Sequence, residues 1–114
     1  MFLELKSRGV EVEPSLREHI ERRLMFALSR FGSRVSKVSV TLADNNGPKG
    51  GIDKSCQIVI RLHGVGEVIA EVVDSEWSIA VDRAMNRIGH NVSRALERLR
   101  DFEHEPVSGS PSNL

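Results

Sequence analysis

The sequence predicts an α+β protein of one domain, with one four-stranded sheet and two helices packed on one face of it. Three observations support this prediction. The chain has 114 residues, which suits a single domain. Apolar residues recur at helical spacing in two segments, and they alternate with other residues at period two in four segments. In chain order, these segments give β-α-β-β-β-α.

The first strand and the first helix are predicted within residues 2–31. Leu3, Leu5 and Ser7 alternate with Phe2, Glu4 and Lys6, which indicates a strand. Pro14 follows, and proline is favoured in the first turn of a helix. From there to about residue 31 the apolar residues Leu16, Ile20, Leu24, Ala27, Leu28 and Phe31 form one helical face. Gly32 is placed to end this helix in a left-handed conformation.

Three more strands are predicted between residues 37 and 73. Their apolar faces comprise Val38, Val40 and Leu42, then Cys56, Ile58, Ile60 and Leu62, then Val68, Ala70 and Val72. One apolar and one polar face are typical of an antiparallel sheet. The segment His63-Gly64-Val65-Gly66 predicts a tight hairpin between the last two strands.

The second helix is predicted from about Ser75 to Phe102. Its apolar face contains Trp77, Val81, Ala84, Ile88, Val92, Ala95, Leu99 and Phe102. Residues 103–114 contain Ser, Pro and Gly without periodicity, so we expect a disordered tail there. The chain would then divide into a folded domain, residues 1–102, and a tail, residues 103–114.

A strip of basic side chains runs beside the apolar face of this last helix. At about 100° per residue, Arg83, Arg87, His90, Arg94 and Arg98 share it, with Asn91 at its edge. Glu97 and Asp101 lie beside the strip mainly near its end, so carboxylates do not fully neutralise it. Residue spacing alone leaves two interpretations open, a solvated helix face and a surface that binds an anion.

The first helix carries a weaker basic surface. Arg22, Arg23 and Arg30 point away from its apolar face by helical phase, and Phe26 is exposed beside them. Phe26 is either a residue that stacks on a base or a contact at the rim of some other partner. We expect Lys6 and Arg8 of the first strand to extend this basic surface between the helices.

Composition limits the function classes. The net charge is zero, which counts against a nucleic-acid binder, although twelve of the sixteen basic residues are arginine, the better phosphate ligand. No apolar run approaches the roughly 20 residues of a membrane span, and the N-terminus does not resemble a signal peptide. A single cysteine, Cys56, cannot form an internal disulfide. We therefore expect a cytoplasmic protein with no membrane partner.

No motif predicts catalysis. Residues 47–51, Gly-Pro-Lys-Gly-Gly, lack the Gly-Lys-Ser/Thr ending of a phosphate loop. Cys56 is in phase with core residues, and His63 has no evident third partner for a nucleophilic triad. The histidines and the cysteine lack metal-ligand spacing. The sequence therefore predicts no enzyme, cofactor, metal site or small-molecule substrate.

Three segments of the chain are distinctive when taken together. They are Ser7-Arg8-Gly9-Val10-Glu11-Val12-Glu13-Pro14 at the entry to the first helix, the loop at residues 46–56, and Ala80-Val81-Asp82-Arg83-Ala84 of the last helix. This set resembles the ribosome hibernation promoting factors and ribosome-associated inhibitor A, in the short form related to sigma-factor modulation proteins. The resemblance covers about residues 1–101, in the same order of elements.

This resemblance implies a cytoplasmic protein that binds the small ribosomal subunit and its rRNA. Members of the family occupy the channel used by mRNA and tRNA, and they inhibit translation under stress or in stationary phase. Basic positions of the family match Arg87, His90 and Arg94 in the last helix, Arg23 in the first helix and Arg8 at the strand end. Helical phase adds Arg22, Arg83 and Arg98 to the predicted RNA-binding residues.

Two other function classes stay open. The first is a protein-binding regulatory module, of the dimerising or sigma-factor modulating type, that does not bind RNA. Val59, Ile69 and Val73 lie on the predicted polar face of the sheet and would form its apolar patch, and a weak homodimer is left open. A small enzyme would need a closed pocket with convergent titratable groups, and the sequence indicates none.

Overall fold

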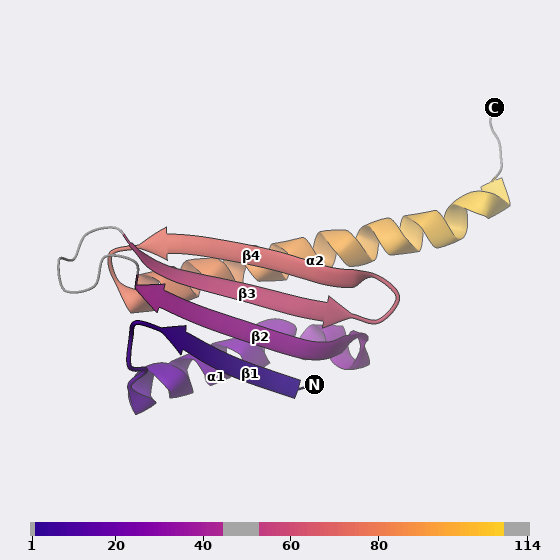
Figure 1. Cartoon of the computed structure of the whole chain (residues 1–114). Coiled ribbons are helices and arrows are strands. Elements are labelled where there is room, and N and C mark those ends of the chain that lie inside the picture. Colours follow the sequence, from indigo (N-terminus) through magenta and orange to yellow (C-terminus); the bar gives the residue numbers. More distant parts are fainter. Residues whose placement is uncertain (1, 45–52, 109–114) are drawn as a thin grey trace.

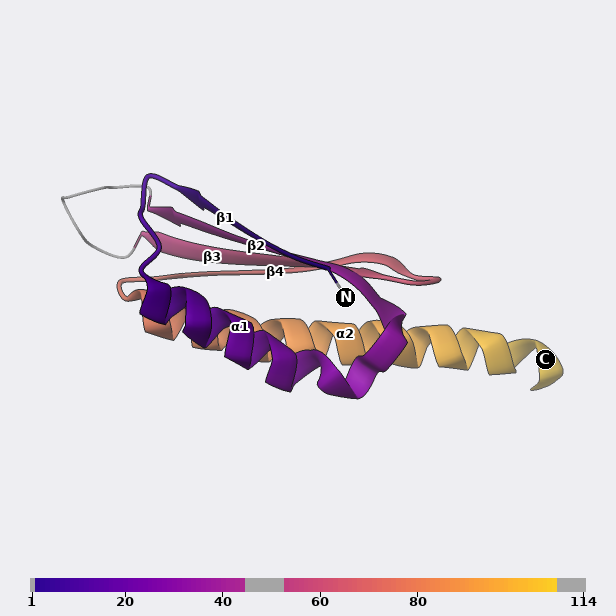
Figure 2. The same ribbon diagram turned by 90° about the horizontal axis from the view of Figure 1, so that it is seen from below.

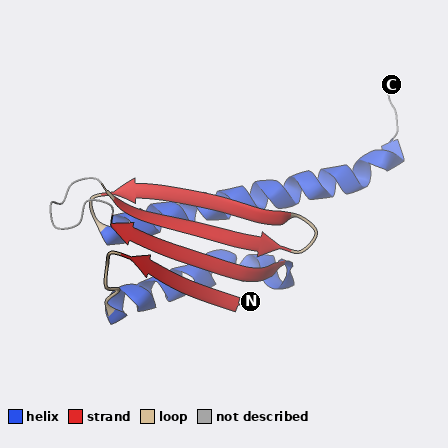
Figure 3. Ribbon diagram, in the orientation of Figure 1, coloured by secondary structure: helices blue, strands red, loops and turns tan. Residues whose placement is uncertain are grey.

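Four strands form one sheet in the order β1-β2-β3-β4, and the computed structural model describes residues 2–44 and 53–108 of the chain. The strands are β1 (Phe2–Arg8), β2 (Val35–Asp44), β3 (Lys54–Leu62) and β4 (Gly66–Asp74). The helices are α1 (Pro14–Leu28), the 3₁₀ segment η1 (Ser29–Arg34) and α2 (Trp77–Ser108). Figure 3 shows this arrangement by type of element, and the predicted order β-α-β-β-β-α is confirmed.

Both helices cover the same face of the sheet, as Figure 2 shows. The predicted apolar strand faces form the floor of the core, and side chains such as Val40 and Ile58 are fully buried. Ile20 and Leu24 of α1 and Ile88 of α2 cover the core on the side of the helices. Burying each such side chain contributes roughly 1.5–3 kcal/mol, so the pattern of apolar residues decides which face of each element turns inward.

The apolar surface of α2 is broader than the single face that the sequence predicted. Ala80, Met85 and Gly89 are also buried, because α2 packs against α1 as well as against β3 and β4. A helix that contacts two neighbours buries more than one stripe. This second contact surface brings α1 and α2 side by side along most of α1 (Figure 2).

The antiparallel arrangement predicted for the three strands within residues 37–73 is confirmed, but the sheet as a whole is mixed. β1 pairs with β2 in parallel, with Leu3 opposite Val38 and Leu5 opposite Val40, whereas the β2–β3 and β3–β4 pairs are antiparallel. The reason is the connection, because α1 carries the chain back across the sheet before β2 begins. A helical crossover of this kind joins parallel strands.

The ends of the helices refine the prediction. The α-helix stops at Leu28, with Ser29 as its C-cap, and tightens into η1. Gly32 takes a positive φ of 55°, but it does so inside η1 and does not end α1 as predicted. The hairpin between β3 and β4 is confirmed, with Gly64 and Gly66 at positive φ. α2 continues past Phe102 to Ser108, and its last turns extend beyond the sheet (Figure 1).

Two predictions fall on parts of the chain outside the described residues. Residues 109–114 lie there, so the division into a domain and a disordered tail stays a prediction, although residues 103–108 are helical. Residues 47–51 lie there as well, and the rejection of a phosphate loop is likewise untested.

Candidate nucleic-acid interface

The basic strip predicted on α2 is exposed along its whole length. Arg83, Arg87, His90, Arg94 and Arg98 all present exposed side chains, and Asn91 is half-buried at their edge. Four of them, with Asn86 and Asn91, line one hollow of about 400 Å³. The helix therefore places these groups as its periodicity predicted, and the structure adds what surrounds each of them.

The side of the strip nearest the sheet is tied to the edge strand β4. Arg83 Nη1 pairs with Asp74 Oδ2 at 3.1 Å, and Arg87 Nη1 donates to the carbonyl oxygen of Glu71 at 3.0 Å. Asn91 Nδ2 donates to the carbonyl oxygen of Ile69 at 3.1 Å. These bonds satisfy carbonyl groups on an edge that would otherwise be open to another strand. A neutral carbonyl leaves the full positive charge on Arg87, whereas Asp74 neutralises Arg83.

Asp74 also stabilises the turn that leads into α2. Its Oδ1 accepts from the backbone N–H groups of Ser75, at 2.7 Å, and Glu76, at 3.4 Å. These two bonds, the Ser75 one foremost, together with Arg83, hold the pKa of Asp74 below its usual value. The Asp74 carboxylate is therefore ionised at neutral pH and remains paired with Arg83.

The outer side of the strip has no such partners. Within the described ranges, His90, Arg94 and Arg98 make no ion pair or hydrogen bond. Glu67 lines a hollow of about 300 Å³ together with Arg94 and Arg98, but its carboxylate pairs with Arg61 at 3.0 Å. The guanidinium groups of Arg94 and Arg98 are therefore free to meet a multivalent anion, and Arg is suited to phosphate because its planar fork donates two bonds at once.

A second basic hollow, of about 600 Å³, lies between α1 and α2. Its basic residues are Arg23, Arg30 and His90, and none of the described residues that line it is acidic. Arg30 reaches across to α2, where its Nη2 donates to Ser93 Oγ at 3.3 Å, and its guanidinium stacks over the Phe31 ring at 4.7 Å. Arg30 was not among the predicted RNA-binding residues, although helical phase had already placed it on the exposed side of α1.

His90 and Asn86 line both this groove and the hollow along the strip, so the two form one continuous basic surface. Arg23 joins it through the groove, but its Nε lies 3.3 Å from Asp82 Oδ1 on α2 and outside hydrogen-bond geometry. His19 Nε2 lies 2.9 Å from the same oxygen. Arg23 thus contributes to the contact between the helices as well as to the groove.

Arg22 and Arg8 do not join this surface. Arg22 is highly exposed on α1, pairs with Glu18 at 3.6 Å and lines neither basic hollow. Arg8 pairs in register with Ala43, on the face of the sheet opposite the buried Leu42. Because side chains alternate along a strand, Arg8 and Lys6 point to the face without helices. The expectation that they extend the basic surface between the helices is therefore wrong.

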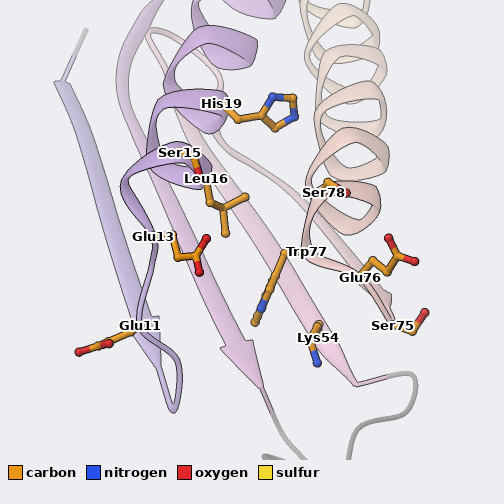
Figure 4. Close-up of a pocket in the computed structure, with 10 residues that line it drawn as sticks. All are labelled: Glu11, Glu13, Ser15, Leu16, His19, Lys54, Ser75, Glu76, Trp77 and Ser78. Carbon is orange, nitrogen blue, oxygen red and sulfur yellow. The ribbon is translucent and has the colours of Figure 1, made fainter.

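The other end of the helix pair carries a hollow of similar size and opposite charge. It has a volume of about 630 Å³ and contains three carboxylates, Glu11, Glu13 and Glu76, with Lys54 and Trp77 at its centre. Figure 4 shows these side chains coming from the approach to α1, the start of β3 and the start of α2. Lys54 Nζ lies 5.9 Å from the centre of the Trp77 ring. The sequence did not predict this hollow, because its residues come from three separate segments.

The remaining chemical candidates lie away from both basic hollows. Cys56 is buried in the core as predicted, and burial raises the pKa of its thiol to about 12, so the thiolate is scarce at neutral pH. Among the described residues, no three His, Cys, Asp or Glu side chains gather as a metal site would require. No helix within residues 2–44 and 53–108 is long and apolar enough to span a membrane.

The fold and the exposed cations define a small α+β domain with a basic surface built on two helices. The family model for the sigma 54 modulation protein / S30EA ribosomal protein family matches residues 3–100, and the chain belongs to this family. The resemblance found in the sequence is thereby confirmed. A search of curated proteins gives no match.

Two solved structures share this fold. A ribosomal subunit interface protein from Coxiella burnetii has a TM-score of 0.69 at 21% sequence identity, over 82% of this chain and 96% of its own. The N-terminal domain of Protein Y from Thermus thermophilus has a TM-score of 0.67 at 26% identity, over 82% of this chain and 98% of its own. The matched part of this chain therefore corresponds to almost the full length of both related structures.

Proposed function

We propose that this protein binds the small ribosomal subunit through its rRNA and holds the ribosome inactive under stress or in stationary phase. It would do so in the cytoplasm, without catalysis, by occupying the channel that mRNA and tRNA use. The observation that carries the proposal is the continuous basic surface of α1 and α2 in a chain of this family. The Coxiella burnetii protein of the same fold is described as a ribosomal subunit interface protein.

The contacts would be mostly with phosphate. Arg87, His90 and Arg94 would form the centre of the interface, and Arg83 and Arg98 would flank it along α2. Neutralising phosphates releases counterions, so affinity falls steeply with salt. The strip covers about four helical turns, near 22 Å, which is long enough to meet several phosphates of a folded RNA.

Sedimentation tests this proposal directly. The full chain is mixed with ribosomes and spun through a sucrose cushion at about 50 mM and about 200 mM salt, with separated subunits run in parallel. We expect the protein to pellet with the small subunit at low salt and largely to leave it at high salt. Absence from the ribosome pellet at low salt would contradict the proposal.

A second candidate function rests on the sheet face without helices. Ile69 is 51% exposed and Val73 is 44% exposed on β4, and Val59 pairs with Ile69 from β3. An exposed apolar group on an uncovered face favours a protein-binding module, with a dimer or a transcription sigma factor as partner. Sedimentation equilibrium would then show that the wild type is a dimer at both low and high salt. The Ile69→Lys variant would be a monomer. A monomer in both samples would exclude self-association.

A further inference from the structure

The groove between α1 and α2 contains a largely exposed aromatic side chain. Phe26 is 77% exposed and lines the groove beside the guanidinium groups of Arg23 and Arg30. Its neighbour Met25, 63% exposed, lines a different and mainly apolar hollow against β1. An exposed aromatic ring among cations provides a stacking surface next to phosphate ligands, which is the combination found where proteins bind unpaired bases.

No side chain covers the floor of the groove at residue 89, because this residue is glycine. Gly89 lies in the interior of α2, and its φ is not positive, so the backbone does not require glycine there. A Cβ at this position would meet only Arg30 Nη2, at an ordinary contact distance of 3.8 Å. Glycine in a helix interior is destabilising relative to alanine. Since alanine would fit in the free protein, the missing side chain keeps room for something that packs on this floor.

The lining of the groove matches a nucleotide. Ala27 and Met85 add apolar contact, and the Asn86 amide offers both a donor and an acceptor to a base edge. The volume of about 600 Å³ is in the range of small-ligand sites. His90 and Asn86 also line the hollow that holds Arg87 and Arg94, so a base in the groove would have its backbone on the strip.

We propose that this groove binds one unpaired RNA base, stacked on Phe26 and packed over Gly89, while the strip on α2 binds the adjoining phosphates. The inference rests on the proposed function, because it specifies which kind of RNA the same surface takes. Bases in a duplex are stacked and paired, so a duplex would reach only the strip. The protein would therefore distinguish single-stranded from double-stranded RNA at this point.

The test measures binding of the full chain to a fluorescein-labelled single-stranded RNA of twelve uridines and to a duplex of equal length, by fluorescence anisotropy. We expect Phe26→Ala to weaken binding of the single strand about tenfold, with an unchanged salt dependence and unchanged duplex binding. Met25→Ala, which removes another largely exposed side chain, from a different hollow, is the matched control and should bind both RNAs as wild type does.

Gly89→Ala separates a ligand site from a folding defect. We expect this variant to melt at a higher temperature than wild type and yet to bind the single strand more weakly. The inference is overturned if Phe26→Ala binds the single strand within twofold of wild type, if Met25→Ala loses as much, or if Gly89→Ala binds with full affinity. Failure of the proposed function is a separate result, because wild type would then not sediment with ribosomes whatever the groove binds.

Discussion

Two hollows of nearly equal volume lie between α1 and α2, and they differ in charge. The one at the start of both helices, about 630 Å³, contains Glu11, Glu13 and Glu76 against a single lysine, Lys54. The one further along, about 600 Å³, is lined by Arg23, Arg30 and His90, and none of the described residues that line it carries a carboxylate. Asp82, which contacts both His19 and Arg23, lies between these two regions. The two hollows cannot be distinguished by their volumes, but the charges of the side chains that line them differ.

This difference explains how a chain of zero net charge can present a surface for a polyanion. The sequence has sixteen basic and sixteen acidic residues, but the fold does not mix them evenly. Carboxylates gather where both helices begin, and arginines gather along the middle of α2 and the groove. The local potential, and not the total charge, decides where an anion binds.

The largest expected effect comes from reversing charge at the centre of the basic region. Arg87→Glu combined with Arg94→Glu removes two phosphate ligands and adds two repulsive charges. Each charge-assisted bond is worth about 1.5–3 kcal/mol, so we expect ribosome binding to fall by at least about a hundredfold. Sedimentation with ribosomes at low salt measures it, and circular dichroism checks that the fold is kept, since both side chains are exposed.

A matched control makes the same total change of charge elsewhere. Lys6→Glu with Arg17→Glu places the new carboxylates on the uncovered face of the sheet and on the first turns of α1. We expect binding within about threefold of wild type, because exposed charges more than about 10 Å away are largely screened. Equal loss in both double variants would show that net charge sets the affinity and that the strip is not the site.

Much of the fold could be predicted because it depends on periodicity. The alternating strands and the two helical stripes fix which side chains are buried, and Val40, Ile58 and Ile88 lie in the core as expected. The parallel pairing of β1 with β2 was missed because alternation does not state the direction of a neighbouring strand. The helix that connects β1 to β2 did indicate that the two strands are parallel.

The candidate site was predictable where it follows one helix and unpredictable where it depends on contacts between elements. The phase of α2 placed Arg87 and Arg94 correctly. Nothing local indicates that Arg83 meets Asp74, or that Arg30 crosses to Ser93, because these pairs form only when the helices and the sheet pack together. Arg8 was misplaced although strand parity with Leu3 and Leu5 already assigned it to the other face.

A smaller effect compares one carboxylate from each region. Glu97→Gln removes a negative charge beside the basic strip, and Glu76→Gln removes one from the acidic hollow. We expect Glu97→Gln to tighten ribosome binding about threefold and Glu76→Gln to leave it unchanged, because Glu97 is on α2 beside the strip and Glu76 lines the other hollow. Salt weakens the interaction between exposed charges steeply with distance. Affinities measured by sedimentation at a fixed low salt concentration decide between them. Equal tightening by both variants would remove the distinction between the two hollows.

The smallest expected effect concerns Asp74, which joins the two regions through Arg83 on one side and the start of α2 on the other. Because the folded protein lowers its pKa from the ordinary value of 3.8, the ionised carboxylate stabilises the fold above that pH. The contribution is lost as the pH falls through the lowered pKa. We therefore expect Asp74→Asn to melt below wild type from pH 5 to pH 8, by an amount that stays nearly constant over that range. The difference should shrink as the pH falls below 3.8. Thermal melts of both proteins across this range measure it, and a difference that persists at the lowest pH would show that the hydrogen bonds to Ser75 and Glu76 do not need the charge.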